Sequence, residues 1–167
     1  MSSVEEKKHS EYLGKLVTNM QSLEFALRAF LRNIEIALNP PKIIIMLDKM
    51  KEGETVPVTA FTNYDNLKQL IQKYNDNPKV ISANMTIDAT LVDIRDAIAH
   101  GRVSAPYPSS DLTLLKFGEP IKPLKNQVRV TFSVLITEEW LKKQIKRFYD
   151  AVIKVSQANQ MLQSGKL

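Results

Sequence analysis

Apolar residues recur at steps of three and four along the first part of the chain. This spacing predicts one long helix over residues 4–38, because positions three or four apart share a face of a helix. The apolar stripe consists of Leu13, Leu16, Val17, Met20, Leu23, Leu27, Phe30, Leu31, Ile34 and Leu38. Two prolines then end the helical pattern. The helix is longer than one small core requires, so its surplus apolar surface is expected to face a second subunit.

The segment after the prolines gives a mixed signal. Residues 42–51 contain an isoleucine triplet that favours a strand, but a proline near the start and a glycine after the end favour a short helix. The short helix is the preferred interpretation. Residues 53–60 are expected to form a loop. Thr62 is then expected to cap a helix over residues 63–74, which the sequence Asn-Asp-Asn-Pro ends.

The second half of the chain combines helical and strand patterns. Apolar residues at helical spacing predict a helix over residues 84–100. Alternating apolar residues over 112–117 and 128–136 predict an antiparallel β-hairpin, which must pack on the helices to be stable. Thr137 is expected to cap a last helix over residues 138–162. The predicted fold is therefore a mainly α bundle of four to five helices, with a small hairpin before the last helix.

Composition limits the classes that this chain can belong to. Its 167 residues are enough for one domain, 1–167, with a core of its own. Cysteine is absent, which excludes disulfides and thiolate metal sites and suits a reducing, cytoplasmic location. No apolar run is long enough to cross a membrane, and no signal peptide is evident. The net charge of +5 is compatible with binding a polyanion.

Three groups capable of acid–base and phosphate chemistry lie near the end of the helix predicted at 84–100. Asp96 precedes His100 by four positions, so the two are surface neighbours and the carboxylate can orient the imidazole. The fork of Arg95 fits phosphate oxygens in a bidentate way. Gly101 follows, where a left-handed residue commonly ends a helix. Arg102, just past the helix end, offers a second phosphate contact.

These groups suit transesterification of RNA by its own 2′-hydroxyl. That reaction needs a base for the 2′ proton, an acid for the leaving 5′ oxygen and cations for the charged phosphorane, and it needs no metal or cofactor. His100 supplies only one of the two proton-transfer groups. A symmetric dimer that brings two copies of His100 and Arg95 to one phosphate would complete the site.

The segment Arg95-Asp96-Ala97-Ile98-Ala99-His100 resembles the Arg-polar-x3-His signature of HEPN domains. The resemblance implies an α-helical bundle that dimerises through its motif helices. It also implies a metal-independent endoribonuclease of toxin–antitoxin or RNA-processing type, with an antitoxin as a further partner. Cleavage by 2′-hydroxyl attack should leave a 2′,3′-cyclic phosphate. Arg95 would hold the scissile phosphate, His100 would be the acid–base group, and Asp96 would fill the polar position. The hairpin, at about 112–136, is an elaboration that the resemblance does not explain.

Two other functional classes stay open. Some HEPN domains do not cleave RNA and act as nucleotide- or RNA-binding modules, and a protein-interaction domain is a third alternative. Tyr107 lies close enough in sequence to stack on a base, although a loop tyrosine more often packs on its own domain. The basic residues of the last helix and the hairpin either form a solvated surface or bind along the phosphate backbone of an RNA. They are Lys122, Lys125, Arg129, Lys142, Lys143, Lys146 and Arg147.

Other charged residues have simpler interpretations. Asp88, Asp93 and Asp96 could be imagined as metal ligands, but no second histidine lies nearby. A solvated helix face is the preferred interpretation for them, and no metal site is expected. Glu24 and Arg28 are expected to form a surface pair along the first helix.

Overall fold

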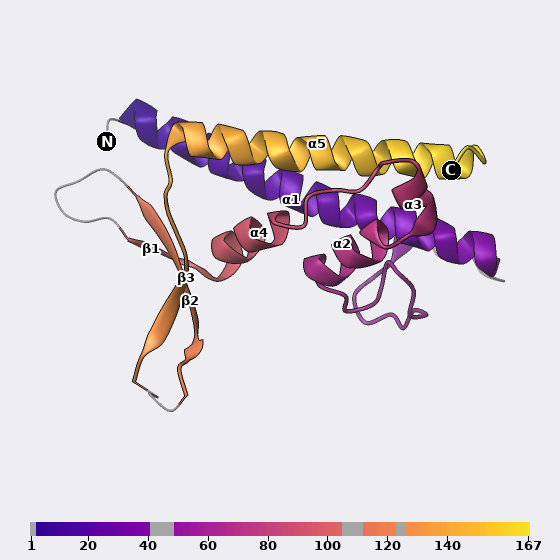
Figure 1. Ribbon diagram of the computed structural model, residues 1–167, viewed down its shortest axis with the longest axis horizontal. Coiled ribbons are helices and arrows are strands. Elements are labelled where there is room, and N and C mark those ends of the chain that lie inside the picture. The colour runs from indigo at the N-terminus through magenta and orange to yellow at the C-terminus, as the bar shows by residue number, and fades with distance from the viewer. Residues whose placement is uncertain (1–2, 41–48, 105–111, 123–125) are drawn as a thin grey trace. The chain divides into compact units, whose positions relative to one another are not determined.

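The structure is a computed structural model that describes residues 3–40, 49–104, 112–122 and 126–167. In these ranges the chain forms five helices and one three-stranded antiparallel sheet (Figure 1). In chain order they are α1 (Ser3–Leu38), α2 (Leu67–Asn75), α3 (Pro78–Ser82), α4 (Leu91–His100), β1 (Arg102–Ser104), β2 (Thr113–Pro120), β3 (Val128–Leu135) and α5 (Glu138–Gln163). The predicted mainly helical fold with a small antiparallel sheet before the last helix is confirmed. Most of the segment 42–51, with its predicted short helix, lies outside the described residues.

The chain divides into two compact units. The first comprises Met1–Gln21 and Thr90–Asp150, and the second comprises Ser22–Ala89 and Ala151–Leu167. Each unit therefore contains part of α1 and part of α5. The motif helix α4 and the whole sheet belong to the first unit.

Within each unit, α1 and α5 pair with the same register. Side-chain hydrogen bonds join residues that are 126 positions apart, which means that the two helices run parallel. The pairs are Tyr12 with Glu138 and Asn19 with Ile145 in the first unit, and Asn33 with Asn159 in the second. Buried residues follow steps of three and four on both helices, as at the seam of a coiled coil. They are Leu16, Met20, Leu23, Leu27 and Phe30 on α1, and Leu141, Gln144, Phe148, Ala151, Val155 and Ala158 on α5.

The sheet of the first unit is larger than predicted. β2 and β3 form the predicted hairpin, and β1 adds a third strand that pairs Arg102 with Leu115. β1 was not predicted because its three residues are too few for a visible alternation of apolar and polar positions. Leu114 of β2 is buried, and β2 packs against α4. Thr137 caps α5 as predicted, because its hydroxyl accepts a hydrogen bond from the amide of Trp140.

Two predicted helix starts are wrong. α2 begins four residues later than predicted, because Asn66 forms a capping box with Gln69. Thr62 bonds instead to the carbonyl of Pro57, within the preceding turn. The motif helix begins at Leu91 rather than at residue 84, since the side chain of Asn75 bonds both backbone groups of Ile87 and holds that segment out of a helix.

Arg28 has a structural role that the predicted surface pair does not describe. Besides Glu24, its guanidinium donates hydrogen bonds to the carbonyls of Ala60 and Asp65, at 3.0 and 2.7 Å. Glu35, two turns further along α1, accepts from the amide of Ala60. The Arg28 side chain is only 13% exposed. A loop without regular hydrogen bonding is therefore fixed to α1 by charged side chains.

Tyr74 lies at the centre of the second unit. Its side chain is fully buried, its hydroxyl donates to the carbonyl of Met85 at 2.9 Å, and its ring meets Phe30 edge-on at 4.9 Å. Burial raises the pKa of Tyr74 to about 12. The folded protein therefore keeps this phenol protonated at a pH where an unfolded chain would ionise it.

We predict that Tyr74 makes the protein sensitive to alkali. Above pH about 10 the unfolded chain loses the phenolic proton that the fold retains, so the free energy of unfolding falls as pH rises toward 12. Tyr74→Phe should lower stability at pH 8 by about 1 kcal/mol through the lost hydrogen bond, and should then lose less between pH 8 and 11 than the wild type. Urea unfolding at both pH values measures this. Tyr64→Phe, at an exposed tyrosine, is the control and should match the wild type. An alkaline loss in Tyr74→Phe as large as that of the wild type would contradict the prediction.

Candidate functional site

The motif helix α4 presents one apolar face and one polar face. Leu91, Ile94 and Ala97 are buried, which accounts for the helical spacing of apolar residues seen in the sequence. Asp93 and His100 are exposed and lie seven positions apart, so they share a face of the helix. The polar groups of the motif therefore project from the part of α4 that the core does not use.

Gly101 ends α4 for a different reason from the one predicted. Its φ of −75° and ψ of 174° are extended, so the expected left-handed conformation is wrong. The glycine is required by space instead. A Cβ at this position would lie 2.2 Å from the carbonyl oxygen of Ala97, 2.8 Å from Cδ1 of Leu114 and 2.9 Å from the carbonyl oxygen of Leu115. Only a residue without a side chain lets the backbone of β2 approach the end of α4 this closely.

The close approach of β2 brings a third charged residue to the motif. Asp96 accepts a hydrogen bond from Nη1 of Arg95 at 2.8 Å, and its other carboxylate oxygen lies 3.4 Å from Nζ of Lys116. Each of these side chains is between 28% and 30% exposed. One carboxylate thus holds two cations side by side in a partly desolvated setting, where charge interactions exceed those at an open surface. The three residues are called the Arg95–Asp96–Lys116 cluster below.

Lys116 is the site residue that sequence reasoning missed. It lies 20 positions beyond Asp96, on a strand, and its approach depends on how β2 packs against α4. The sequence of a predicted hairpin does not show that one of its lysines will contact an aspartate on a preceding helix. Asp96 also differs from its expected role, because the structure directs its two carboxylate oxygens to Arg95 and Lys116.

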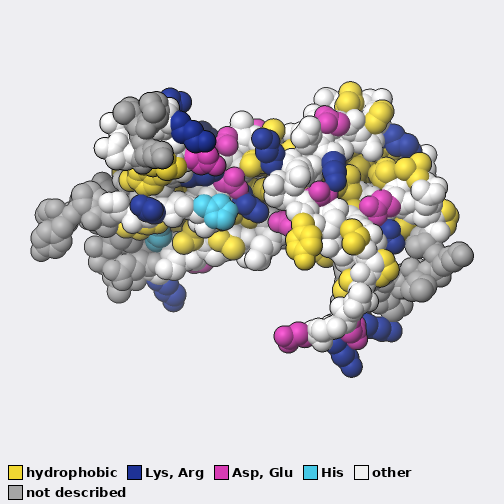
Figure 2. All heavy atoms as spheres, turned by 90° about the horizontal axis from the view of Figure 1, so that it is seen from below, with side chains coloured by type: hydrophobic (Ala, Val, Ile, Leu, Met, Phe, Trp, Pro, Cys, Tyr) yellow, Lys and Arg dark blue, Asp and Glu magenta, His cyan; other side chains and the backbone are white. Residues whose placement is uncertain are grey.

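His100 is the last residue of α4 and is exposed. It follows Asp96 by four positions, one helical turn toward the C-terminus. The space-filling view shows basic and acidic side chains interspersed on the face of the molecule that it presents (Figure 2). The arrangement offers an accessible proton-transfer group one turn away from a pair of cations.

Arg102 and Tyr107 are the two residues expected to bind substrate, and the structure describes only Arg102. The guanidinium of Arg102 lies 5.3 Å from the ring centre of Phe117, in a cation–π contact. Arg102 pairs with Leu115, so it points to the sheet face opposite to that of Lys116. Tyr107 lies outside the described residues.

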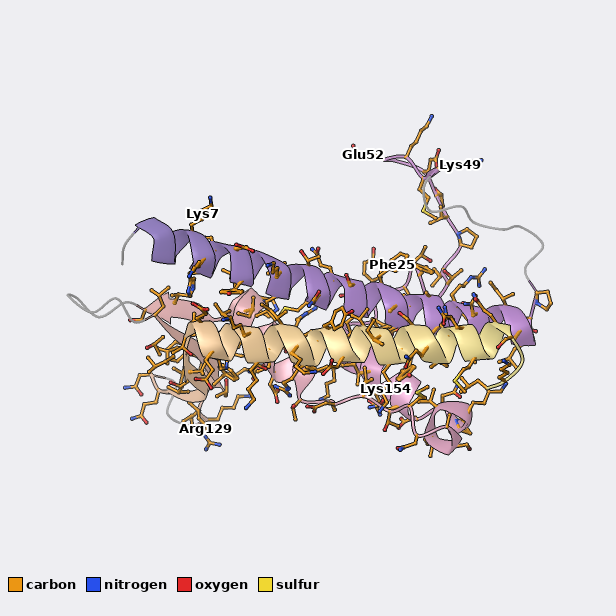
Figure 3. All side chains as sticks on the ribbon, turned by 90° about the horizontal axis from the view of Figure 1, so that it is seen from above. Lys7, Phe25, Lys49, Glu52, Arg129 and Lys154 are labelled. Carbon is orange, nitrogen blue, oxygen red and sulfur yellow. The ribbon has the colours of Figure 1, made fainter. Side chains whose placement is uncertain are left out.

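Two of the basic residues on α5 form ion pairs with acids of their own helix. Lys142 pairs with Glu138 at 2.6 Å, and Lys146 pairs with Asp150 at 2.7 Å. The hydrogen bond to Glu138 also raises the pKa of Lys142. Arg129 differs from these lysines, because it projects from β3 and is exposed (Figure 3). Lys142 and Lys146 thus fit the solvated helix face better than a track for RNA, whereas the sheet offers an exposed cation at Arg129.

Within residues 3–40, 49–104, 112–122 and 126–167, no three His, Cys, Asp or Glu side chains come together as ligands for a metal ion. Among the same residues, no helix has the length and apolar character needed to cross a bilayer.

Comparison with known proteins assigns this chain to no family. No protein-family model matches the chain, and no curated protein or solved structure matches it. The motif and its surroundings in the first unit are therefore the basis for a functional assignment.

We predict that Gly101→Ala destabilises the protein by about 1–3 kcal/mol or more, which is the usual cost of overpacking. The new Cβ would clash with three atoms, and two of them belong to the backbone and cannot easily move away. Gly14→Ala is the matched control. Gly14 is in α1 of the same unit and has open space at the Cβ position, so alanine should be neutral or stabilise by about 0.5–1 kcal/mol. Thermal and urea unfolding of both variants provide the measurement. Equal stability of the two variants would show that the helix–strand approach is not as close as described.

Proposed function

We propose that this protein is a metal-independent endoribonuclease of the HEPN type that acts as a homodimer in the cytoplasm. The observation that carries the proposal is the Arg95–Asp96–Lys116 cluster, one helical turn from the exposed His100. Two cations held by one carboxylate suit a phosphodiester, whose charge increases in the transition state. An antitoxin-type inhibitor is the further partner that this class of enzyme implies.

The reaction would be transesterification within the RNA strand. One imidazole removes the proton of the 2′-hydroxyl, and the 2′ oxygen forms a new bond to the adjacent phosphorus. The bond from phosphorus to the 5′ oxygen breaks, and that oxygen takes a proton from a second, protonated imidazole. The products are a 2′,3′-cyclic phosphate and a 5′-hydroxyl. Arg95 and Lys116 would stabilise the additional negative charge on the non-bridging oxygens.

The dimer follows from the number of imidazoles. The chain has two histidines, of which His9 is on α1 and His100 is in the motif. A second copy would therefore supply the second proton-transfer group. The end of α4 that carries His100 is exposed, which leaves room for this partner.

A non-catalytic nucleotide- or RNA-binding module is the alternative. It is favoured by the fact that Asp96 already neutralises part of the charge of Arg95 and Lys116. In such a module the cluster would bind phosphate, but His100 would have no role in the activity.

We predict that the purified protein cleaves single-stranded RNA in EDTA. His100→Ala should lower the rate by about 100-fold or more, since proton transfer contributes this much. Arg95→Ala should lower it similarly, and Arg95→Lys should restore only part because it keeps the charge without the planar fork. His9→Ala is the matched control and should leave the rate unchanged. Gel assays and end analysis of the products measure these effects.

Two results would overturn this proposal. One is wild-type protein that binds RNA but does not cleave it, which is the behaviour of the alternative module. The other is cleavage by His100→Ala at the wild-type rate, which would place the activity elsewhere or in a contaminant.

A further inference from the structure

A small cavity of about 340 Å³ opens in the first unit between the start of α4 and the sheet. Its walls come from three elements and from the residue that precedes α4. They are Thr90, Asp93, Ile94, Lys116, Thr131 and Phe132. The volume is near the lower end of the roughly 300–1,000 Å³ typical of small-molecule sites, so the cavity suits one planar ring system rather than a longer ligand.

A β-bulge shapes the sheet side of this cavity. Lys116 pairs with Phe132, but the next pair is Phe117 with Val130, so Thr131 is an extra residue in β3. Residues opposite each other share a sheet face, so Lys116 and Phe132 both point to the cavity. The bulge also turns Thr131 toward it, and the Thr131 hydroxyl donates to the carbonyl of Lys116 at 3.2 Å. Bulges commonly re-aim a side chain in this way beside functional sites.

The cavity brings together a carboxylate, an ammonium group and an aromatic ring. Asp93 is exposed, and within the described part of the chain its carboxylate forms no ion pair. Lys116 provides an ammonium group, and Phe132 provides a ring that is partly exposed. The hydroxyl of Thr90 accepts a hydrogen bond from Arg147 at 2.6 Å, which ties this wall to α5. Aromatic rings and such polar groups are what proteins use to hold an unpaired base.

We propose that this cavity is a base subsite that takes a single unpaired nucleobase, with guanine preferred. The inference rests on the proposed function, because Lys116 belongs both to the cavity and to the Arg95–Asp96–Lys116 cluster. A base seated here therefore lies next to the phosphate site. Its ring would stack on Phe132, while its edge meets Asp93 and Lys116.

The preference for guanine follows from the order of donors and acceptors. The Watson–Crick edge of guanine carries two adjacent N–H donors, which a carboxylate accepts in pairs, and one carbonyl oxygen, which an ammonium group reaches. Adenine and cytosine present one amino donor next to ring acceptors, and uracil has a single N–H between two carbonyls. Only guanine offers Asp93 a bidentate contact and Lys116 an acceptor at the same time.

Binding of single nucleotides tests the subsite without requiring cleavage. The probes are GMP, AMP, CMP and UMP, titrated into the full chain by calorimetry or ligand-observed NMR. GMP should bind about tenfold more tightly than AMP, the discrimination expected of one bidentate base contact. Asp93→Asn replaces one acceptor oxygen with a donor and should remove this difference. Glu139→Gln is the matched control, because Glu139 is also an acid in the first turn of a helix, and it should keep the preference.

A second variant covers the aromatic wall. Phe132→Leu should weaken all four nucleotides by about tenfold or more, as expected when one base-stacking side chain is removed. Circular dichroism and thermal unfolding establish whether the variant folds. If it does not, Asp93→Asn alone decides the question.

The outcomes separate this inference from the proposed function. Equal binding of the four nucleotides, or an unchanged GMP preference in Asp93→Asn, overturns the subsite even if the protein cleaves RNA. A preference for GMP that Asp93→Asn removes supports the subsite even if no RNA is cleaved, in which case the ribonuclease proposal fails alone. Where both hold, cleavage should also occur preferentially beside guanine, and Asp93→Asn should abolish that selectivity.

Discussion

The candidate site depends on the close approach of β2 to the end of α4 at Gly101. A Cβ there would lie 2.8 Å from Cδ1 of Leu114 and 2.9 Å from the carbonyl oxygen of Leu115, both in β2, so this approach requires glycine. This approach places Lys116 beside Asp96 and forms the cluster. It also forms one side of the cavity, whose other side is the start of α4. A single backbone contact in the first unit thus positions the cations proposed to bind phosphate and the walls proposed to bind a base.

Charge within the cluster is balanced in a way that suits a phosphate site. Two cations without a counter-ion would repel each other in a partly desolvated setting, and Asp96 offsets that repulsion. The cluster keeps an excess positive charge, so it can still attract an anion. Because the cations are held before substrate arrives, less ordering is needed on binding.

The sequence predicts the elements of this fold better than it predicts their contacts. Spacing of apolar residues identified α1 and α5, since long amphipathic helices repeat the same signal many times. The start of α2 differs from the prediction because Thr62 and Asn66 are both good capping residues, and the capping box of Asn66 with Gln69 decides between them. The start of α4 differs because the bonds from Asn75 to Ile87 join residues 12 positions apart, which helical spacing cannot reveal. Lys116 had no signal, since its role arises from packing across 20 residues. Gly101 ends α4 at the predicted position, but glycine is needed there because of the close contacts at its Cβ position and not because of a left-handed conformation.

The position of a bound phosphate tests the central claim most directly. A crystal structure of the protein with a short RNA whose cleavage-site nucleotide lacks its 2′-hydroxyl would capture the complex before reaction. We predict that one phosphate lies within hydrogen-bond distance of both Arg95 and Lys116, with His100 of one protomer near the 5′ oxygen. A structure in which the RNA binds elsewhere, while the Arg95–Asp96–Lys116 cluster remains closed on itself, would contradict the account.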